Sequence, residues 1–270
     1  MRSASAARSY SNIWAVNALK RFLVIAALFA GMTAPAISPA EPLPTVQDVR
    51  RFAEDVVIGT QSGGRLVKWL RAPTVRLETM VPGPRDEETG RAIPIPAKTP
   101  MQHYTKLRRH VTSLKELTGM SIRLMPRDIG SGGDIVVTVV PRTAMGQLPF
   151  PGVPEKTLER LMGPSRCFFL IWPNPDWSIQ KARIVINSFL EEKHINHCFL
   201  EELTQSLGLP NDSERLRPSI FNETSMLTEL SALDRILIRT VYDPRIDTGM
   251  NLGRFRETVV PVIGAYMSSD

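Results

Sequence analysis

Four stretches of the chain carry apolar residues at the spacing of an amphipathic helix. Thr45 and Ser231 precede two of them and suit helix N-caps. Gly119 and Gly208 follow the other two and suit C-terminal ends. We therefore predict helices over residues 46–56, 101–119, 196–207 and 231–243.

Apolar runs without helical spacing predict five strands. They cover residues 68–78, 121–125, 134–140, 165–172 and 181–186. The proline-rich segment 82–100 is expected to be a loop. Residues 130–133 are expected to be a plain turn, because they lack the Lys-Ser/Thr ending of a phosphate-binding loop. Helices and strands are interspersed without strict alternation, which predicts an α+β fold with a mixed sheet packed on helices.

The first 40 residues have the order of a secretory signal. Lys20 and Arg21 precede an apolar run over residues 22–30, and small residues follow at 34–36 and 38–40. The apolar run is well short of the ~20 residues that a membrane-spanning helix needs. We interpret the segment as a cleaved signal peptide and expect a periplasmic or secreted protein, with no stable membrane span after cleavage.

Removal of this segment changes the charge of the protein. The full chain has a net charge of +6. Residues 1–40 contain four basic and no acidic residues, so the mature chain carries only about +2. Nucleic-acid binding, which needs a basic stripe on the folded domain, is therefore not expected.

Cys167 and Cys198 are the two cysteines of the chain. In an oxidising compartment a pair of cysteines most simply forms one disulfide, and the alternative is two buried free thiols. The disulfide would close a loop of about 30 residues and contribute roughly 3 kcal/mol.

The most informative segment is residues 197–212, His-Cys-Phe-Leu-Glu-Glu-Leu-Thr-Gln-Ser-Leu-Gly-Leu-Pro-Asn-Asp. Glu201 and Gln205 are four residues apart, so they share one face of the predicted helix, with Glu202 beside them. The glycine at 208 ends the helix and turns the chain. The turn brings Asn211 or Asp212 back towards that face.

This arrangement resembles the zinc helix of the zincin metallopeptidases, whose motif H-E-x-x-H continues in metzincins as H-x-x-G-x-x-H. The resemblance implies that Glu201, Gln205 and Asn211 occupy the three ligand positions, and that Glu202 occupies the position of the general base. Residues 219–221 resemble the metzincin methionine turn, with Phe221 in place of methionine. Residues 230–242 resemble the C-terminal helix of matrixin-type metzincins.

The segment is more closely similar to a bacterial family of exported proteins, domain of unknown function 2927. The shared pattern is Cys-x-x-Glu-Glu-x-x-Gln-x-Leu-Gly-Leu-x-Asn-Asp, together with Asp-Pro-Arg at 243–245. This resemblance implies a fold rather than a reaction. It divides the chain into a signal peptide (1–40), an N-terminal helix and linker (41–64), a zincin-like domain (65–250) and a C-terminal tail (251–270).

The donor atoms differ from those of a zinc site. Zinc prefers imidazole or thiolate, whereas both histidine positions here hold oxygen side chains. No cofactor is therefore expected, although zinc or another divalent ion remains an alternative, held by Glu201, Gln205, Asn211, Asp212 or His197. His197 is expected at the helix start, solvated or bonded to backbone.

Residues 103 and 108–110 lie on the second predicted helix. We expect His103 and His110 at the surface, and the run Arg108–Arg109–His110 to be a solvated face.

These features leave three functional interpretations. The first is a zincin-like module without zinc peptidase activity that binds an envelope protein or a glycan. The second is a metal-dependent hydrolase with oxygen ligands and Glu202 as the base. The third is a structural component of the envelope.

The expected disulfide can be tested by thiol titration. We expect no reactive thiol in the exported protein before reduction, because both cysteines are paired. Two reactive thiols in the unreduced protein would exclude the bridge.

Overall fold

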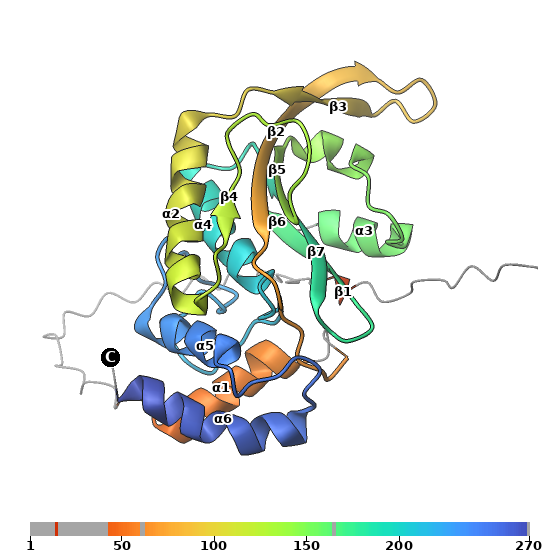
Figure 1. Ribbon diagram of the computed structural model, residues 1–270. Coiled ribbons are helices and arrows are strands. Elements are labelled where there is room, and N and C mark those ends of the chain that lie inside the picture. The colour runs from red at the N-terminus through yellow and green to blue at the C-terminus, as the bar shows by residue number, and fades with distance from the viewer. Residues whose placement is uncertain (1–13, 16–42, 60–62, 164–165, 269–270) are drawn as a thin grey trace, which may run out of the picture.

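The computed structural model describes residues 14–15, 43–59, 63–163 and 166–268 (Figure 1). The helices are α1 (Val46–Ile58), α2 (Met101–Thr118), α3 (Glu155–Met162), α4 (Glu192–Gln205), α5 (Ala232–Tyr242) and α6 (Leu252–Met267), with a 3-10 helix, η2 (Arg142–Gln147). The strands are β1 (Trp14–Ala15), β2 (Thr74–Arg85), β3 (Ala92–Ala97), β4 (Arg123–Leu124), β5 (Ile135–Val140), β6 (Cys167–Pro173) and β7 (Ile179–Asn187).

All of these strands belong to one mixed sheet. Its order is β1-β6-β7-β5-β2-β3, and β4 also pairs with β2. Strands β4, β2, β5 and β7 run parallel to one another. Strand β6 is antiparallel to β7, β3 is antiparallel to β2, and β1 is antiparallel to β6. The mixed sheet and the separate helices confirm the predicted α+β class.

Helices cover both faces of the sheet. In Figure 1, α2 and α4 lie on one side, η2 and α3 lie on the other, and α1, α5 and α6 gather below. Strand β6 contributes to both layers. Phe169 and Ile171 enter the larger core under α2 and α4, whereas Phe168 and Leu170 pack with Met145 of η2 on the opposite face. A strand buried on both faces reads as a continuous apolar run, as this one does.

Two capping boxes confirm the predicted helix starts. The Thr45 side chain accepts from the Asp48 backbone N–H and Asp48 bonds back to Thr45, and Ser231 and Asp234 do the same for α5. Asp234 is fully buried and also accepts from the Ser219 hydroxyl at 2.6 Å. The capping box of α5 therefore also holds the 219–221 turn, through Asp234.

Residues 251–270 were expected to form a tail, but most of them form α6, which is a correction. Phe255, Val259, Val262 and Ile263 are buried in the main core, and α6 packs on α1. The helical spacing of these residues was present in the sequence. Pro261 argued against a helix in this segment, because a proline normally interrupts a helix. This proline sits at an exposed position of α6, where the helix tolerates it.

The expected loop over residues 82–100 is also corrected. It holds the last four residues of β2 and all of β3, and the two strands form an antiparallel hairpin. Pro94 and Pro96 lie in β3, the last strand in the sheet order, where a missing N–H does not break an inner ladder. The first predicted strand begins at Thr74 rather than at residue 68, α4 begins four residues before the expected start, and α3 had not been predicted.

The end of α4 lies directly against the chain segment before β2. Gly208 has a φ of 107°, and a Cβ added there would lie 2.0 Å from the carbonyl oxygen of Val67. The Trp69 indole donates to the Ser206 carbonyl at 3.0 Å, and the Tyr242 hydroxyl donates to the Leu207 carbonyl at 2.7 Å. This close contact requires glycine, which explains why the predicted helix stop stands at residue 208.

A pair of glycine substitutions tests this packing. Gly208→Ala should lower the free energy of unfolding by about 3–5 kcal/mol, because the new methyl group meets backbone and the φ is unfavourable for alanine. Gly264→Ala, in α6, should raise it by about 0.5–1 kcal/mol, because an added Cβ there meets nothing within 4 Å. Urea unfolding of both variants measures the difference. Equal effects would contradict the close contact at residue 208.

Candidate functional site

Helix α4 carries the predicted site, and it lies between α2 and the sheet (Figure 1). Its apolar residues Ile195, Phe199, Leu200 and Leu203 are buried in the main core. Because the helix is covered on several sides, four of its polar residues are buried as well: His197, Glu202, Thr204 and Gln205. The predicted site is therefore a group of polar side chains that lies next to the hydrophobic core.

His197 and Glu201 form the first polar pair. The imidazole Nε2 lies 3.1 Å from the Glu201 carboxylate, and Nδ1 lies 2.7 Å from the carbonyl oxygen of Leu227. A carbonyl oxygen only accepts, so Nδ1 carries a hydrogen. His197 had been expected at the start of the helix. It is instead buried within α4, because the helix begins at Glu192.

Gln205 and Asp212 form the second pair. The Gln205 amide donates to the Asp212 carboxylate at 2.8 Å, which confirms that the turn at Gly208 returns the chain to this face. Asn211, the other residue expected to return, faces elsewhere. Its amide donates to the Val56 carbonyl at 3.0 Å, next to Gly59. Asn211 therefore fastens the end of α1 to the turn after α4, and its placement as a third ligand stays a prediction.

Glu202 lies beside the disulfide. The structure confirms the Cys167–Cys198 bridge, which joins the first residue of β6 to α4. Glu202 is buried, whereas 17% of the Glu201 side chain is exposed. The Cys167 sulfur and one carboxylate oxygen from each of Glu201 and Glu202 all lie within 4.8 Å of one another. While Cys167 is oxidised it offers no thiolate, which is the form that binds metal.

The 219–221 turn lies in the core. Phe221 is fully buried and packs edge-on against Phe52 of α1 at 6.2 Å between ring centroids. The neighbouring Ile220 N–H donates to the buried Asp234 carboxylate. Burial raises the pKa of Asp234 despite these hydrogen bonds.

The histidines of α2 correct another expectation. His103 and His110 are buried between α2 and α4 rather than exposed. Each Nε2 has a partner on α4 at 2.9 Å: the Glu192 carboxylate for His103 and the Asn196 side-chain oxygen for His110. Burial lowers the pKa of His110. Their spacing with Leu107 and Leu114 on one helix face was the signal in the sequence.

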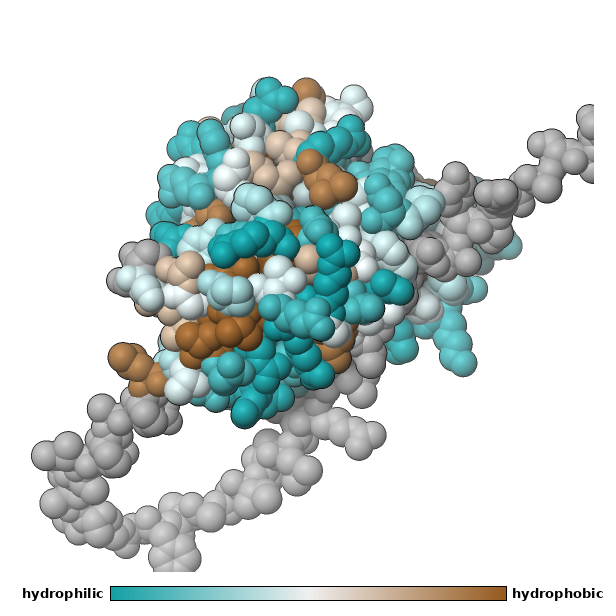
Figure 2. Space-filling view, turned by 60° about the horizontal axis from the view of Figure 1, so that its bottom comes forward, coloured by the Kyte–Doolittle hydropathy of each residue, from teal (hydrophilic) through white to brown (hydrophobic). Residues whose placement is uncertain are grey.

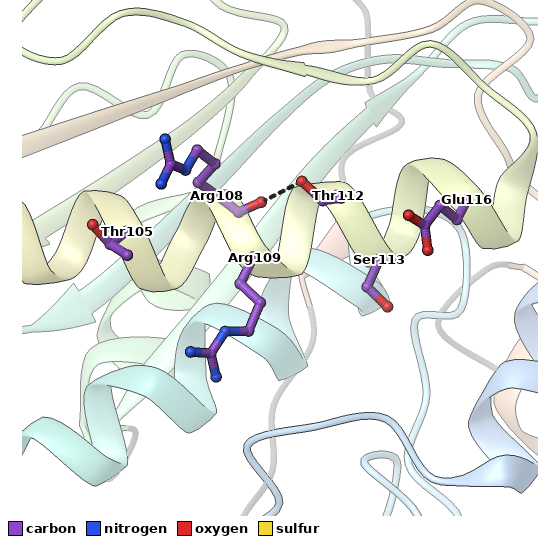
Figure 3. A pocket seen from close by; sticks show the side chains of 6 residues that line it. All are labelled: Thr105, Arg108, Arg109, Thr112, Ser113 and Glu116. Atoms are coloured by element: carbon purple, nitrogen blue, oxygen red, sulfur yellow. Dashed lines mark hydrogen bonds between the residues drawn. The ribbon is translucent and has the colours of Figure 1, made fainter.

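The outer face of α2 forms an open hollow (Figure 3). Its lining residues are Thr105, Arg108, Arg109, Thr112, Ser113 and Glu116. All six come from this single helix, and Arg108 and Arg109 project in different directions in Figure 3. The Thr112 hydroxyl bonds to the helix backbone at the Arg108 carbonyl, 2.9 Å away. These arginines are exposed, as expected for a solvated face.

A second charged hollow lies between α1, α6 and residue 215, on the side that Figure 2 brings forward, where hydrophilic residues predominate. Its acidic groups are paired with arginines. Glu54 bonds to Arg256 at 2.9 Å, and Asp55 bonds to Arg215 at 2.9 Å. These two ion pairs join α1 to α6 and to Arg215. The charged side chains of this hollow therefore link elements of the fold.

The Gln205–Asp212 pair can be tested by charge substitution. Gln205→Glu should lower the free energy of unfolding at pH 7 by about 2–3 kcal/mol, because it opposes two carboxylates at a buried position. The loss should shrink towards about pH 4, where one carboxyl becomes protonated. The double variant Gln205→Glu, Asp212→Asn should recover stability, because the amide then donates to the new carboxylate. Simple additivity of the two single effects would contradict the contact.

None of the helices in the described part of the chain has the length and hydropathy needed to span a membrane. The apolar run at residues 22–30 lies outside the described residues. The disulfide is consistent with an exported protein.

Comparison with known proteins places the whole arrangement in a family. No curated protein and no solved structure matches the chain. The family described as "Protein of unknown function (DUF2927)" matches residues 54–260, which include α4, the 219–221 turn and α5. The chain belongs to this DUF2927 family.

Proposed function

We propose that the protein is an exported, zincin-like binding module of the bacterial envelope that lacks zinc peptidase activity. We further propose that it binds an extended segment of another protein along the outer edge of β6. The proposal selects a protein over a glycan as the partner. The observation that carries it is that the polar residues at the zincin ligand positions bond to other groups of the chain.

The loss of peptidase activity follows from the donor atoms and from their partners. Glu201 is paired with His197, and Gln205 is paired with Asp212. Asn211 is turned towards α1. A peptidase zinc needs at least three converging ligands and an open position for water. Here a metal at the zincin positions would first require Gln205 to leave Asp212 and Asn211 to leave the Val56 carbonyl.

The edge of β6 supports polypeptide binding. Trp14 and Ala15 pair antiparallel with Ile171 and Leu170 of β6, so a short segment of this chain already adds a strand there. Both residues belong to the expected signal peptide. Its removal would leave backbone N–H and C=O groups of β6 exposed along an apolar strand. Such an edge is a template for an added strand.

A sheet edge favours a protein partner for geometric reasons. Its donors and acceptors repeat at the spacing of an extended polypeptide backbone. The buried residues on both faces of β6 hold this edge rigid. A glycan does not reproduce this alternation of donors and acceptors.

Peptide binding is the direct test. A labelled peptide with the sequence of residues 11–18 should bind the mature protein that lacks residues 1–40, as measured by fluorescence anisotropy. Replacement of both Trp14 and Ala15 in the peptide by proline should weaken binding at least about tenfold, because proline removes backbone donors. Equal binding of the two peptides, or no binding of the first, would contradict the proposed edge.

Metal analysis tests the lack of peptidase chemistry. The oxidised protein, purified without chelator, should contain less than stoichiometric zinc and should not cleave unfolded protein substrates. The matched variants are Glu201→Ala and Gln205→Ala, which should leave the metal content unchanged. A stoichiometric ion that both variants lose, together with cleavage that requires Glu202, would instead support the hydrolase.

A further inference from the structure

We propose that reduction of the Cys167–Cys198 disulfide creates a zinc site in which the Cys167 thiolate joins the carboxylates of Glu201 and Glu202. This inference concerns the reduced protein and goes beyond the proposed function, which concerns the oxidised one. The site uses Cys167 of β6 and Glu202, the residue at the position that the zincin resemblance assigns to the general base. The zincin ligand positions Gln205 and Asn211 take no part.

The donor atoms are already close together. The Cys167 sulfur and one oxygen from each carboxylate lie within 4.8 Å of one another. Around a tetrahedral zinc ion, with Zn–S about 2.3 Å and Zn–O about 2.0 Å, neighbouring donors are about 3.3–3.5 Å apart. Side-chain rotations that move the donor atoms by about 1 Å would therefore bring all three to the ion.

The scaffold around these donors is rigid. Cys167 pairs with Ile186 in the β6–β7 ladder, and the two glutamates lie on α4, which is packed on this sheet. The imidazole of His197 lies 3.1 Å from the Glu201 carboxylate and is itself fixed by the Leu227 carbonyl. A group that bonds to a ligand carboxylate in this way orients it for the metal.

The chemistry of the donors suits zinc. One thiolate and two carboxylates supply three ligands with a combined charge of −3, and water can take the fourth position. The thiolate favours zinc over calcium or magnesium, which prefer oxygen ligands only. The neighbouring Gln205 amide remains bonded to Asp212.

The redox step balances with a dithiol reductant. The dithiol transfers two electrons and two protons to the Cys167–Cys198 bond, which breaks into two thiols, while the reductant closes its own disulfide. Zinc binding then displaces the proton of the Cys167 thiol. Cys198 remains a thiol outside the ligand group. Exchange with a disulfide oxidant, which takes up the two electrons and is reduced to a dithiol, re-forms the Cys167–Cys198 bond, removes the thiolate and releases the ion.

Two matched variants test the site without any reductant. Cys198→Ser and Cys167→Ser both abolish the disulfide, so any loss of stability should be similar. Only Cys198→Ser keeps the Cys167 thiol. In competition with a chromophoric zinc chelator, Cys198→Ser should bind one zinc ion per chain at least about 100-fold more tightly than Cys167→Ser.

A carboxylate variant separates this site from binding by an isolated thiol. Adding Glu201→Gln to Cys198→Ser should weaken zinc binding at least about tenfold. Cobalt in place of zinc should give a thiolate-to-metal absorption band in Cys198→Ser that is absent in Cys167→Ser. Circular dichroism checks the fold of each variant.

If the variants fail to fold, zinc binding by the wild-type protein provides the same test. After reduction with a phosphine and desalting without oxygen, it should bind one zinc ion, whereas the oxidised protein should not. Equal zinc affinity of reduced and oxidised protein, or of the two cysteine variants, would overturn the proposal. Peptide binding at the β6 edge does not depend on this result, so the two proposals fail separately.

Discussion

The structure depends on the burial of α4 between α2 and the sheet. A buried polar group must find a hydrogen-bond partner inside the protein, since the cost of leaving it unpaired is large. Helix α4 meets this requirement at each end and along its length. The pairs are His103–Glu192, His110–Asn196, His197–Glu201 and Gln205–Asp212. The polar groups of α4 therefore hold the helix in place.

This constraint also decides what the helix can do chemically. A metallopeptidase helix must leave its ligands free to converge on an ion. In this protein the corresponding positions are joined to neighbouring groups. The Cys167–Cys198 bridge adds a covalent link from α4 to β6 at the same place. The polar side of α4 is thus used to fasten the sheet to the helical layer, and in the proposed reduced state the Cys167 sulfur would become a metal ligand.

Strand β6 connects this interior to the surface. It is anchored to α4 by the disulfide and to β7 by the antiparallel ladder, and its side chains enter both cores. Its remaining edge meets β1. A rigid strand whose outer edge already pairs with a short strand is suited to recognition of an extended chain. The candidate peptide edge and the candidate metal site therefore share β6 as their support.

Features with a local physical cause were readable from the sequence: helical spacing, the capping boxes at Thr45 and Ser231, and the helix stop at Gly208. The α+β class and the disulfide also followed from the sequence. The tertiary structure decided which side chains meet across long separations. Asn211 and Asp212 are adjacent in the chain, yet only Asp212 faces Gln205, because α1 lies where Asn211 turns. Such choices depend on packing between elements far apart in the sequence, which local patterns do not encode.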